Sequence, residues 1–204
     1  MKIHLGCGPH FLQGWINVDY SLGARIANIP VIGGLVKSLG LFHIEWNPNI
    51  LLHDLSKPLP WPDSSADCIY TSHTLEHLRR EDGDRLIAEC HRVLKPGGVL
   101  RIVVPDLKTC VEDYLNGDIL CERFIESLLV IKSKSANWKH KLLGLVDEGH
   151  LHKCMYDTPG LVRILNQHGF RAASMAAHQS QIPDIETAEK VDRTIRAVVV
   201  EGIK

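Results

Sequence analysis

Ile3-His4-Leu5-Gly6-Cys7-Gly8 is the stretch of this 204-residue chain that says most about its fold. A short apolar strand runs directly into a turn with two glycines, and a second strand is predicted at Trp15 to Asp19. Gly6 and Gly8 let the backbone approach a ligand closely, where a side chain would collide. The stretch therefore indicates either a ligand site after the first strand or a simple tight turn.

Two known glycine motifs do not fit the sequence. The third glycine of a dinucleotide-binding GxGxxG motif would fall at Phe11. The segment Gly33 to Ser38 resembles a phosphate-binding loop, but Val36 stands where a glycine must precede the lysine. Neither motif explains the turn after Leu5.

Strand-like and helix-like segments alternate along the rest of the chain. The helix predicted over Glu81 to Leu94 has an apolar stripe and acidic residues in its first turn, and Pro96-Gly97-Gly98 is expected to stop it. A second helix is expected to begin after Asp157, with Pro159 in its first turn, and to end at Gly169. Further strands are predicted at residues 67–71, 98–104, 170–177 and 194–202. This alternation predicts an α/β fold with a parallel sheet.

Four polar clusters lie at the ends of predicted strands. Asp19, Asp54-Leu55 and Ser72 to Leu78 each follow a strand, with Leu51-Leu52 as the strand before Asp54, and Leu94 to Gly98 leads into the strand at 98–104. In an open α/β sheet, ligands bind at the carboxyl ends of the strands, near the point where the strand order reverses. A carboxylate at Asp19 could accept hydrogen bonds from both hydroxyls of a ribose.

Taken in order, these strings resemble the class I S-adenosylmethionine-dependent methyltransferases, in particular the small methyltransferase type 11 group. The resemblance implies a Rossmann-like, seven-stranded, mostly parallel sheet with helices on both faces and an antiparallel last strand. It also implies S-adenosylmethionine as the cofactor, with the turn around its methionine part, Asp19 at the ribose, and the Asp54-Leu55 pair at the adenine. The cofactor-binding residues that it implies are Gly6, Cys7, Gly8, Asp19, Asp54, Leu55, Ser72 and His73. His4 departs from the family pattern, because many members carry an acidic residue there.

Three histidines are candidates for a general base that takes a proton from the methyl acceptor: His73, His150 and His152. Methyl transfer requires little beyond alignment, so the lack of a catalytic triad is compatible with this chemistry. The letters His73-Thr74-Leu75-Glu76-His77 also match the HxxEH pattern of inverted zinc peptidases, which would place zinc between His73, Glu76 and His77. His150, His152 and Cys154 could form a soft-metal cluster on one face of an extended segment. We expect no metal at either position.

Composition limits the classes of partner. The formal net charge of −1 gives no electrostatic basis for binding nucleic acid. Six scattered cysteines without a CxxC pair predict reduced thiols and a cytoplasmic protein, and no apolar run is long enough to span a membrane. We expect one methyltransferase domain over residues 1–204, with candidate lid segments at 22–45 and 118–148; a homodimer is left open.

The sequence therefore predicts a methyltransferase that acts on an oxygen of a small molecule or a saccharide intermediate. Two alternatives from other classes are kept. One is a non-catalytic module that binds S-adenosylmethionine, and the other is a zinc-dependent hydrolase that uses His73, Glu76 and His77.

Overall fold

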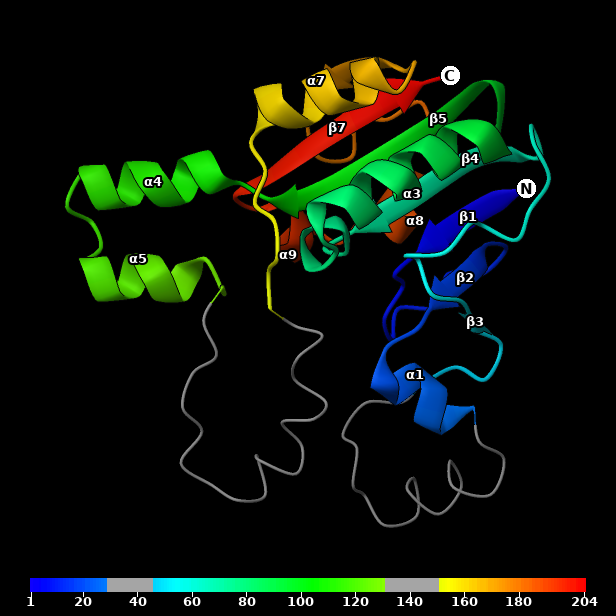
Figure 1. The fold of residues 1–204 in the computed structure, drawn as a ribbon, viewed down its shortest axis with the longest axis horizontal. Helices are drawn as coiled ribbons and strands as arrows, with labels where there is room; N and C mark the ends of the chain where they lie inside the picture. Colours follow the sequence, from blue (N-terminus) through cyan, green and yellow to red (C-terminus); the bar gives the residue numbers. More distant parts are fainter. Residues whose placement is uncertain (29–45, 131–150) are drawn as a thin grey trace.

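A seven-stranded sheet runs through the centre of the computed structural model, which describes residues 1–28, 46–130 and 151–204 (Figure 1). The strands follow the order β3-β2-β1-β4-β5-β7-β6, and all are parallel except β7, which is antiparallel to both of its neighbours. Their bounds are Lys2–Leu5 (β1), Ile16–Asp19 (β2), Leu51–Leu52 (β3), Ala66–Ser72 (β4), Leu94–Pro105 (β5), Arg171–Ser174 (β6) and Ala197–Ile203 (β7). The predicted fold class, with its antiparallel last strand, is confirmed.

The alternation of side chains along the central strands builds a core on each face of the sheet. In β5, Leu100, Ile102 and Val104 belong to the core on one face, and Val99 and Val103 belong to the core on the other. Because successive residues of a strand point to opposite faces, an almost continuous apolar run marks a strand that is covered on both sides.

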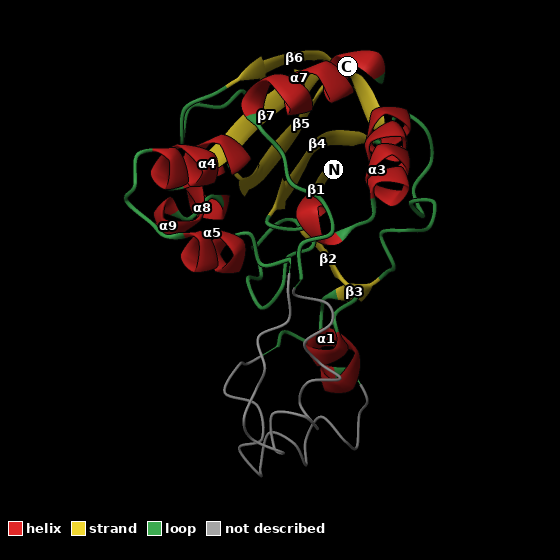
Figure 2. Ribbon diagram, turned by 60° about the vertical axis from the view of Figure 1, so that its left-hand side comes forward, coloured by secondary structure: helices red, strands yellow, loops and turns green. Residues whose placement is uncertain are grey.

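Helices cover both faces of the sheet. On one face, α3 (Arg80–Val93) and α7 (Thr158–Gln167) pack their apolar stripes against it, and on the other face lie α8 (Ile185–Ala188) and α9 (Val191–Thr194) (Figures 1 and 2). The remaining described helices are α1 (Leu22–Ala27), the 3-10 turn η1 (Leu75–His77), α4 (Leu107–Leu115) and α5 (Cys121–Ser127).

The two long predicted helices are confirmed, but three predicted strand boundaries were wrong. β5 begins at Leu94 instead of residue 98, because Leu94 already pairs with Ala66 of β4; the register then shifts, and residues 95–98 bulge out before Val99 pairs with Cys68. β6 spans only Arg171–Ser174, where it pairs with β7 at the edge of the sheet. β7 begins at Ala197, because Arg196 has a positive φ of 57° that interrupts the extended backbone.

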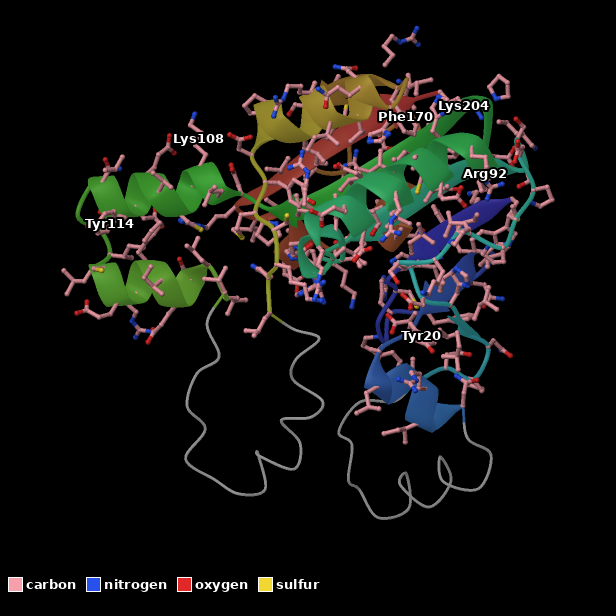
Figure 3. All side chains as sticks on the ribbon, viewed as in Figure 1. Tyr20, Arg92, Lys108, Tyr114, Phe170 and Lys204 are labelled. Atoms are coloured by element: carbon pink, nitrogen blue, oxygen red, sulfur yellow. The ribbon has the colours of Figure 1, made fainter. Side chains whose placement is uncertain are left out.

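The helices α4 and α5 form a hairpin that buries no residue (Figure 1). Tyr114 of α4, labelled in Figure 3, stacks on Phe124 of α5 with a ring-centroid distance of 5.1 Å. Among the described residues, no helix is long and apolar enough to cross a membrane.

Candidate active site

The strand order reverses between β1 and β4, which lie side by side although β2 and β3 come between them in the sequence. Two turns meet at the carboxyl ends of these strands. The Thr74 hydroxyl after β4 donates a long hydrogen bond of 3.4 Å to the carbonyl of Gly6 after β1. In open α/β sheets a ligand crevice forms at this point, so the predicted residues after β1 and β4 share one location.

The two glycines of the first turn have different surroundings. Both adopt a positive φ, of 66° at Gly6 and 55° at Gly8. A Cβ at Gly6 would lie 2.0 Å from the Thr74 hydroxyl oxygen, whereas a Cβ at Gly8 would meet nothing within 4 Å among the described residues. Gly6 is therefore required for packing between the turns, and Gly8 leaves space beside the backbone that a ligand could use.

Asp19 ends β2 and is linked to the glycine turn. The Gly8 amide donates to Asp19 Oδ2 at 2.8 Å, and the Ser21 amide donates to Oδ1 at 2.7 Å. Each carboxylate oxygen accepts only one of these bonds, so each keeps capacity for a second donor. Since Asp19 is 7% exposed, it can present that capacity only toward a ligand held closely against the turn.

Cys7 lies between the two glycines with its side chain buried. Burial, together with the nearby Asp19 carboxylate, raises the pKa of the Cys7 thiol to about 12, so the thiol is neutral at pH 7. With its side chain inside the protein, Cys7 can contribute to a ligand site only through its backbone.

The other cofactor-binding candidates lie after β3 and β4. Asp54 accepts from the Ser56 amide and hydroxyl at 2.9 Å and 2.7 Å, and these bonds lower the pKa of its carboxyl. The adjacent Leu55 packs into the main core. Ser72 ends β4, and its hydroxyl oxygen is buried without a hydrogen-bond partner among the described residues.

His73 is held by contacts at both ring nitrogens. Its Nε2 donates to the Arg193 carbonyl at 2.9 Å, and its Nδ1 lies 3.4 Å from Oε1 of Glu76. Burial alone would lower the pKa of His73, but the Glu76 carboxylate and the Arg193 carbonyl outweigh it and raise that pKa. An imidazole with both nitrogens engaged is better placed to position its neighbours than to accept a proton.

Glu76, His77 and His152 come together beside this turn. One ligand atom from each lies within 4.8 Å of the others. The segment that carries His152 is attached to η1, because the amides of Lys153 and Cys154 both donate to the Glu76 carbonyl, at 2.7 Å and 3.1 Å. Burial is the largest influence on the His152 pKa and lowers it, against the attraction of the Glu76 carboxylate.

Several predicted features lie partly or wholly outside the described residues. His150 is one of them, so of the predicted cluster of His150, His152 and Cys154 the structure describes only His152 and Cys154. Of the candidate lid segments 22–45 and 118–148, the structure describes residues 22–28 and 118–130, which include α1 and α5. The segment from His73 to His77 is not an α-helix, since His73 has a positive φ of 50° and only a 3-10 turn follows.

Sequence reasoning missed two contacts at this location. The packing of Thr74 against Gly6 joins turns that are 68 residues apart. The grouping of His152 with Glu76 brings together residues that are far apart in the sequence, and no local sequence pattern predicts such a contact. The alternating histidines at 150 and 152 predicted a chemical role there, but did not predict that Glu76 lies beside His152.

Residues 3–102 match the family described as "Methyltransferase domain". Over 119 residues, 55% of this chain, the sequence is 31% identical to an uncharacterised 37.1 kDa transposon protein of Streptomyces fradiae. Over 48 residues, 24% of this chain, it is 42% identical to a probable S-adenosylmethionine-dependent methyltransferase of Mycolicibacterium smegmatis. The matched regions span only 32% and 18% of the lengths of these two relatives.

The fold is similar to that of a solved structure from Archaeoglobus fulgidus, described as a SAM-dependent methyltransferase. The TM-score is 0.52 at 15% sequence identity, and the comparison covers 100% of this chain and 85% of that chain. At this identity the likeness shows a shared fold.

Proposed function

Since residues 3–102 belong to the methyltransferase domain family of the class I S-adenosylmethionine-dependent methyltransferases, we propose that this chain transfers a methyl group from S-adenosylmethionine. We propose an oxygen of a small molecule or a saccharide intermediate as the acceptor. One observation carries the proposal: Gly8 donates its amide to the Asp19 carboxylate, while the space beside its Cα is open.

The residues of the crevice fit the cofactor that the family uses. Asp19 keeps acceptor capacity on both carboxylate oxygens, which suits a pair of ribose hydroxyls. The backbone of Gly6, Cys7 and Gly8 would line the methionine part, because no Cβ stands on either glycine and the space beside Gly8 is open among the described residues. The remaining predicted contacts are Asp54 and Leu55 at the adenine, and Ser72 and His73 near the methionine end.

The bound cofactor would supply a methyl group on a sulfonium, which is already electrophilic. The residues of the chain then need to hold the acceptor oxygen in line and to receive its proton. Of the three predicted bases, His73 has both ring nitrogens engaged, and His150 lies outside the described residues. His152 has a buried Nδ1 without a hydrogen-bond partner among the described residues, and we propose this residue for the acceptor side of the site.

The alternatives are not favoured. A zinc hydrolase of the inverted-motif type needs His73 and His77 on one α-helical face, and here a positive φ at His73 separates it from the 3-10 turn. A non-catalytic module would share the cofactor site, so turnover with an acceptor distinguishes it from an enzyme. The net charge of −1 favours a small acceptor over nucleic acid, and six free cysteines support our proposal of a cytoplasmic enzyme.

Calorimetric titration with S-adenosylmethionine and with S-adenosylhomocysteine tests the cofactor site. We expect both to bind the wild-type chain, and Asp19→Asn to bind each at least about 10-fold more weakly, because it loses charge-assisted hydrogen bonds to the ribose. Asp63→Asn is the matched control, since its exposed carboxylate pairs with Arg92 ahead of β4, away from the crevice. Absence of binding by the wild type, or equal affinity in Asp19→Asn, would refute the proposal.

A further inference from the structure

Glu76 is a buried acid whose carboxylate lacks hydrogen-bond partners. The residue is 0% exposed, and neither carboxylate oxygen accepts a hydrogen bond from the described residues. The groups that approach Oε1 are two imidazoles, with His73 Nδ1 at 3.4 Å and His77 Nε2 at 4.0 Å. Burying a carboxylate without hydrogen bonds is costly, so a side chain in this state indicates a bound positive group.

His77 presents a lone pair toward this carboxylate. Its Nδ1 lies 3.1 Å from the Leu151 carbonyl, which can only accept, so in the neutral ring Nδ1 carries the hydrogen and Nε2 carries the lone pair. Histidines that bind metals usually donate their second ring nitrogen to a backbone carbonyl or a carboxylate in this way, which fixes the tautomer and the ring orientation.

His152 completes the group from a distant part of the chain. It is 7% exposed, and its Nδ1 is buried without a hydrogen-bond partner among the described residues. Its ring centroid lies 5.1 Å from that of His77. The His152 amide also donates to the Leu129 carbonyl at 3.0 Å, so the residue is fixed from two sides.

We propose that Glu76, His77 and His152 bind one divalent transition-metal ion, for which Zn²⁺ is the best match by ligand type. Two imidazoles and one carboxylate are a ligand set of catalytic zinc sites, in which a further coordination position stays open. Ligands at about 2 Å from a tetrahedral zinc ion are about 3.3 Å apart. The three side chains, whose ligand atoms lie within 4.8 Å of one another, need to move inward only slightly.

The surrounding residues support this set. His73 places its Nδ1 3.4 Å from Oε1 of Glu76 and donates a hydrogen bond from its Nε2 to the Arg193 carbonyl, so it would orient the Glu76 carboxylate as an outer partner. This ligand set differs from the HxxEH alternative, because its second histidine is residue 152 and His73 is not a ligand. The open position would take an oxygen of the methyl acceptor, a role that rests on the proposed function, whereas metal binding itself does not.

Metal content of the purified full chain tests the site. The protein is prepared without a histidine tag, stripped with a chelator, given Zn²⁺ and desalted, and the zinc is measured by mass spectrometry. We expect about one zinc ion per wild-type chain, and more than about 100-fold weaker binding in Glu76→Gln and His152→Ala, because each loses a ligand. With Co²⁺ in place of Zn²⁺, the wild type is expected to show visible d–d absorption that both variants lack.

His178→Asn is the matched control, because this histidine also lies beside a buried glutamate, with its Nδ1 3.8 Å from Glu189, yet it has no part in the cluster. It should bind zinc as the wild type does. Glu76→Gln keeps the size of the side chain, so it decides the question even if His152→Ala does not fold. Sub-stoichiometric zinc in the wild type, or equal zinc in Glu76→Gln, would overturn the proposal.

The same preparations separate this inference from the proposed function. Asp19→Asn should bind zinc as the wild type does while losing affinity for S-adenosylmethionine, because Asp19 lies outside the metal cluster. Zinc binding without cofactor binding would refute the methyltransferase proposal and leave the metal site standing. Cofactor binding without zinc binding would refute the metal site and leave the methyltransferase proposal standing, with His152 as the proposed general base.

Discussion

Gly6 and Gly8 share a left-handed backbone but serve different purposes. At Gly6 a side chain would collide with Thr74, and at Gly8 it would enter open space. The sequence predicted both glycines as ligand-contacting residues, because a turn motif looks the same whether its glycines face a ligand or a neighbouring turn. The contact with Thr74 can be seen only once β1 and β4 are placed side by side.

Alanine at each position should separate these purposes. We expect Gly6→Ala to lower the free energy of unfolding by more than about 2 kcal/mol, since a positive φ costs about 1–2 kcal/mol and the collision adds to it. Gly8→Ala should lower the free energy of unfolding only by the cost of the positive φ. It should nevertheless weaken the binding of S-adenosylmethionine at least about 10-fold, because the new methyl group occupies the ligand's space. Denaturant unfolding and calorimetry measure the two effects. An unchanged affinity in Gly8→Ala would mean that no ligand lies there.

His4 should make the protein sensitive to acid. Burial, with a smaller effect of the neighbouring His10, lowers the pKa of His4 to about 3 from the ordinary value near 6.5. Between these two values the unfolded chain binds a proton that the folded chain does not, so stability falls as the pH falls, by at most about 1.4 kcal/mol per pH unit. The loss begins below about pH 6.5.

Urea unfolding at pH 7, 5 and 4 checks this expectation. His4→Gln cannot take up the proton, so its free energy of unfolding should fall less steeply than that of the wild type across this range. If His4→Gln and the wild type show the same slope, His4 does not carry the effect.

The elements that the sequence predicted well are those whose local pattern agrees with their packing. The helix α7 has an N-cap, a proline in its first turn and a stripe of Leu161, Ile164 and Leu165 that is buried against the sheet. The helices α8 and α9 were missed because four residues each are too few for a periodic pattern. The helix α4 was missed although its N-cap, Asp106, directly follows the strand-ending Pro105 and could have indicated it.

Two helix caps should differ in their effect on stability. Asp157 caps α7 by accepting from the Gly160 amide at 2.8 Å, and Asp106 caps α4 by accepting from the Lys108 amide at 2.9 Å. We expect Asp157→Ala to lower the free energy of global unfolding by about 1 kcal/mol. Asp106→Ala should leave it nearly unchanged, because α4 buries no residue and can fray locally.

Thermal denaturation compares the global stability of the two cap variants, and amide hydrogen exchange detects fraying of α4. Equal losses of global stability in both variants would show that α4 belongs to the cooperative core. Faster exchange confined to α4 in Asp106→Ala is the expected result.

At the scale of the whole molecule, a buried cluster of charged residues links the sheet to the chain that covers the face where α8 and α9 lie. Arg101 of β5 is 0% exposed and donates to Glu189 at 2.8 Å through two nitrogens and to Glu201 of β7 at 2.9 Å through a third. It also donates to the carbonyls of Ala176 and Gln179, at 3.2 Å and 2.9 Å. Arg101 thus fixes the chain between β6 and α9, and no local sequence pattern indicates its partners.

Removing the Arg101 guanidinium should strongly destabilise the folded protein. Arg101→Met leaves two buried carboxylates without their counter-charge, and we expect a loss of about 3–5 kcal/mol in the free energy of unfolding. Arg92→Met is the matched control: its partners Glu89 and Asp63 lie near the surface, so it should lose no more than about 1 kcal/mol for each ion pair. Guanidinium denaturation measures both. If Arg101→Met and Arg92→Met lose similar amounts of unfolding free energy, burial of the Arg101 cluster does not explain its effect.

The position of β7 between β5 and β6 has a consequence for synthesis of the protein on the ribosome. β5 is complete at Pro105, but its partner begins at Ala197, so one edge of β5 has no strand to pair with while more than 90 residues are translated. An unpaired, apolar strand edge is a template for association with other chains. Until β7 is inserted, Arg101 also lacks Glu201. We expect the nascent chain to be prone to aggregation and to depend on chaperones until residues 197–203 have emerged.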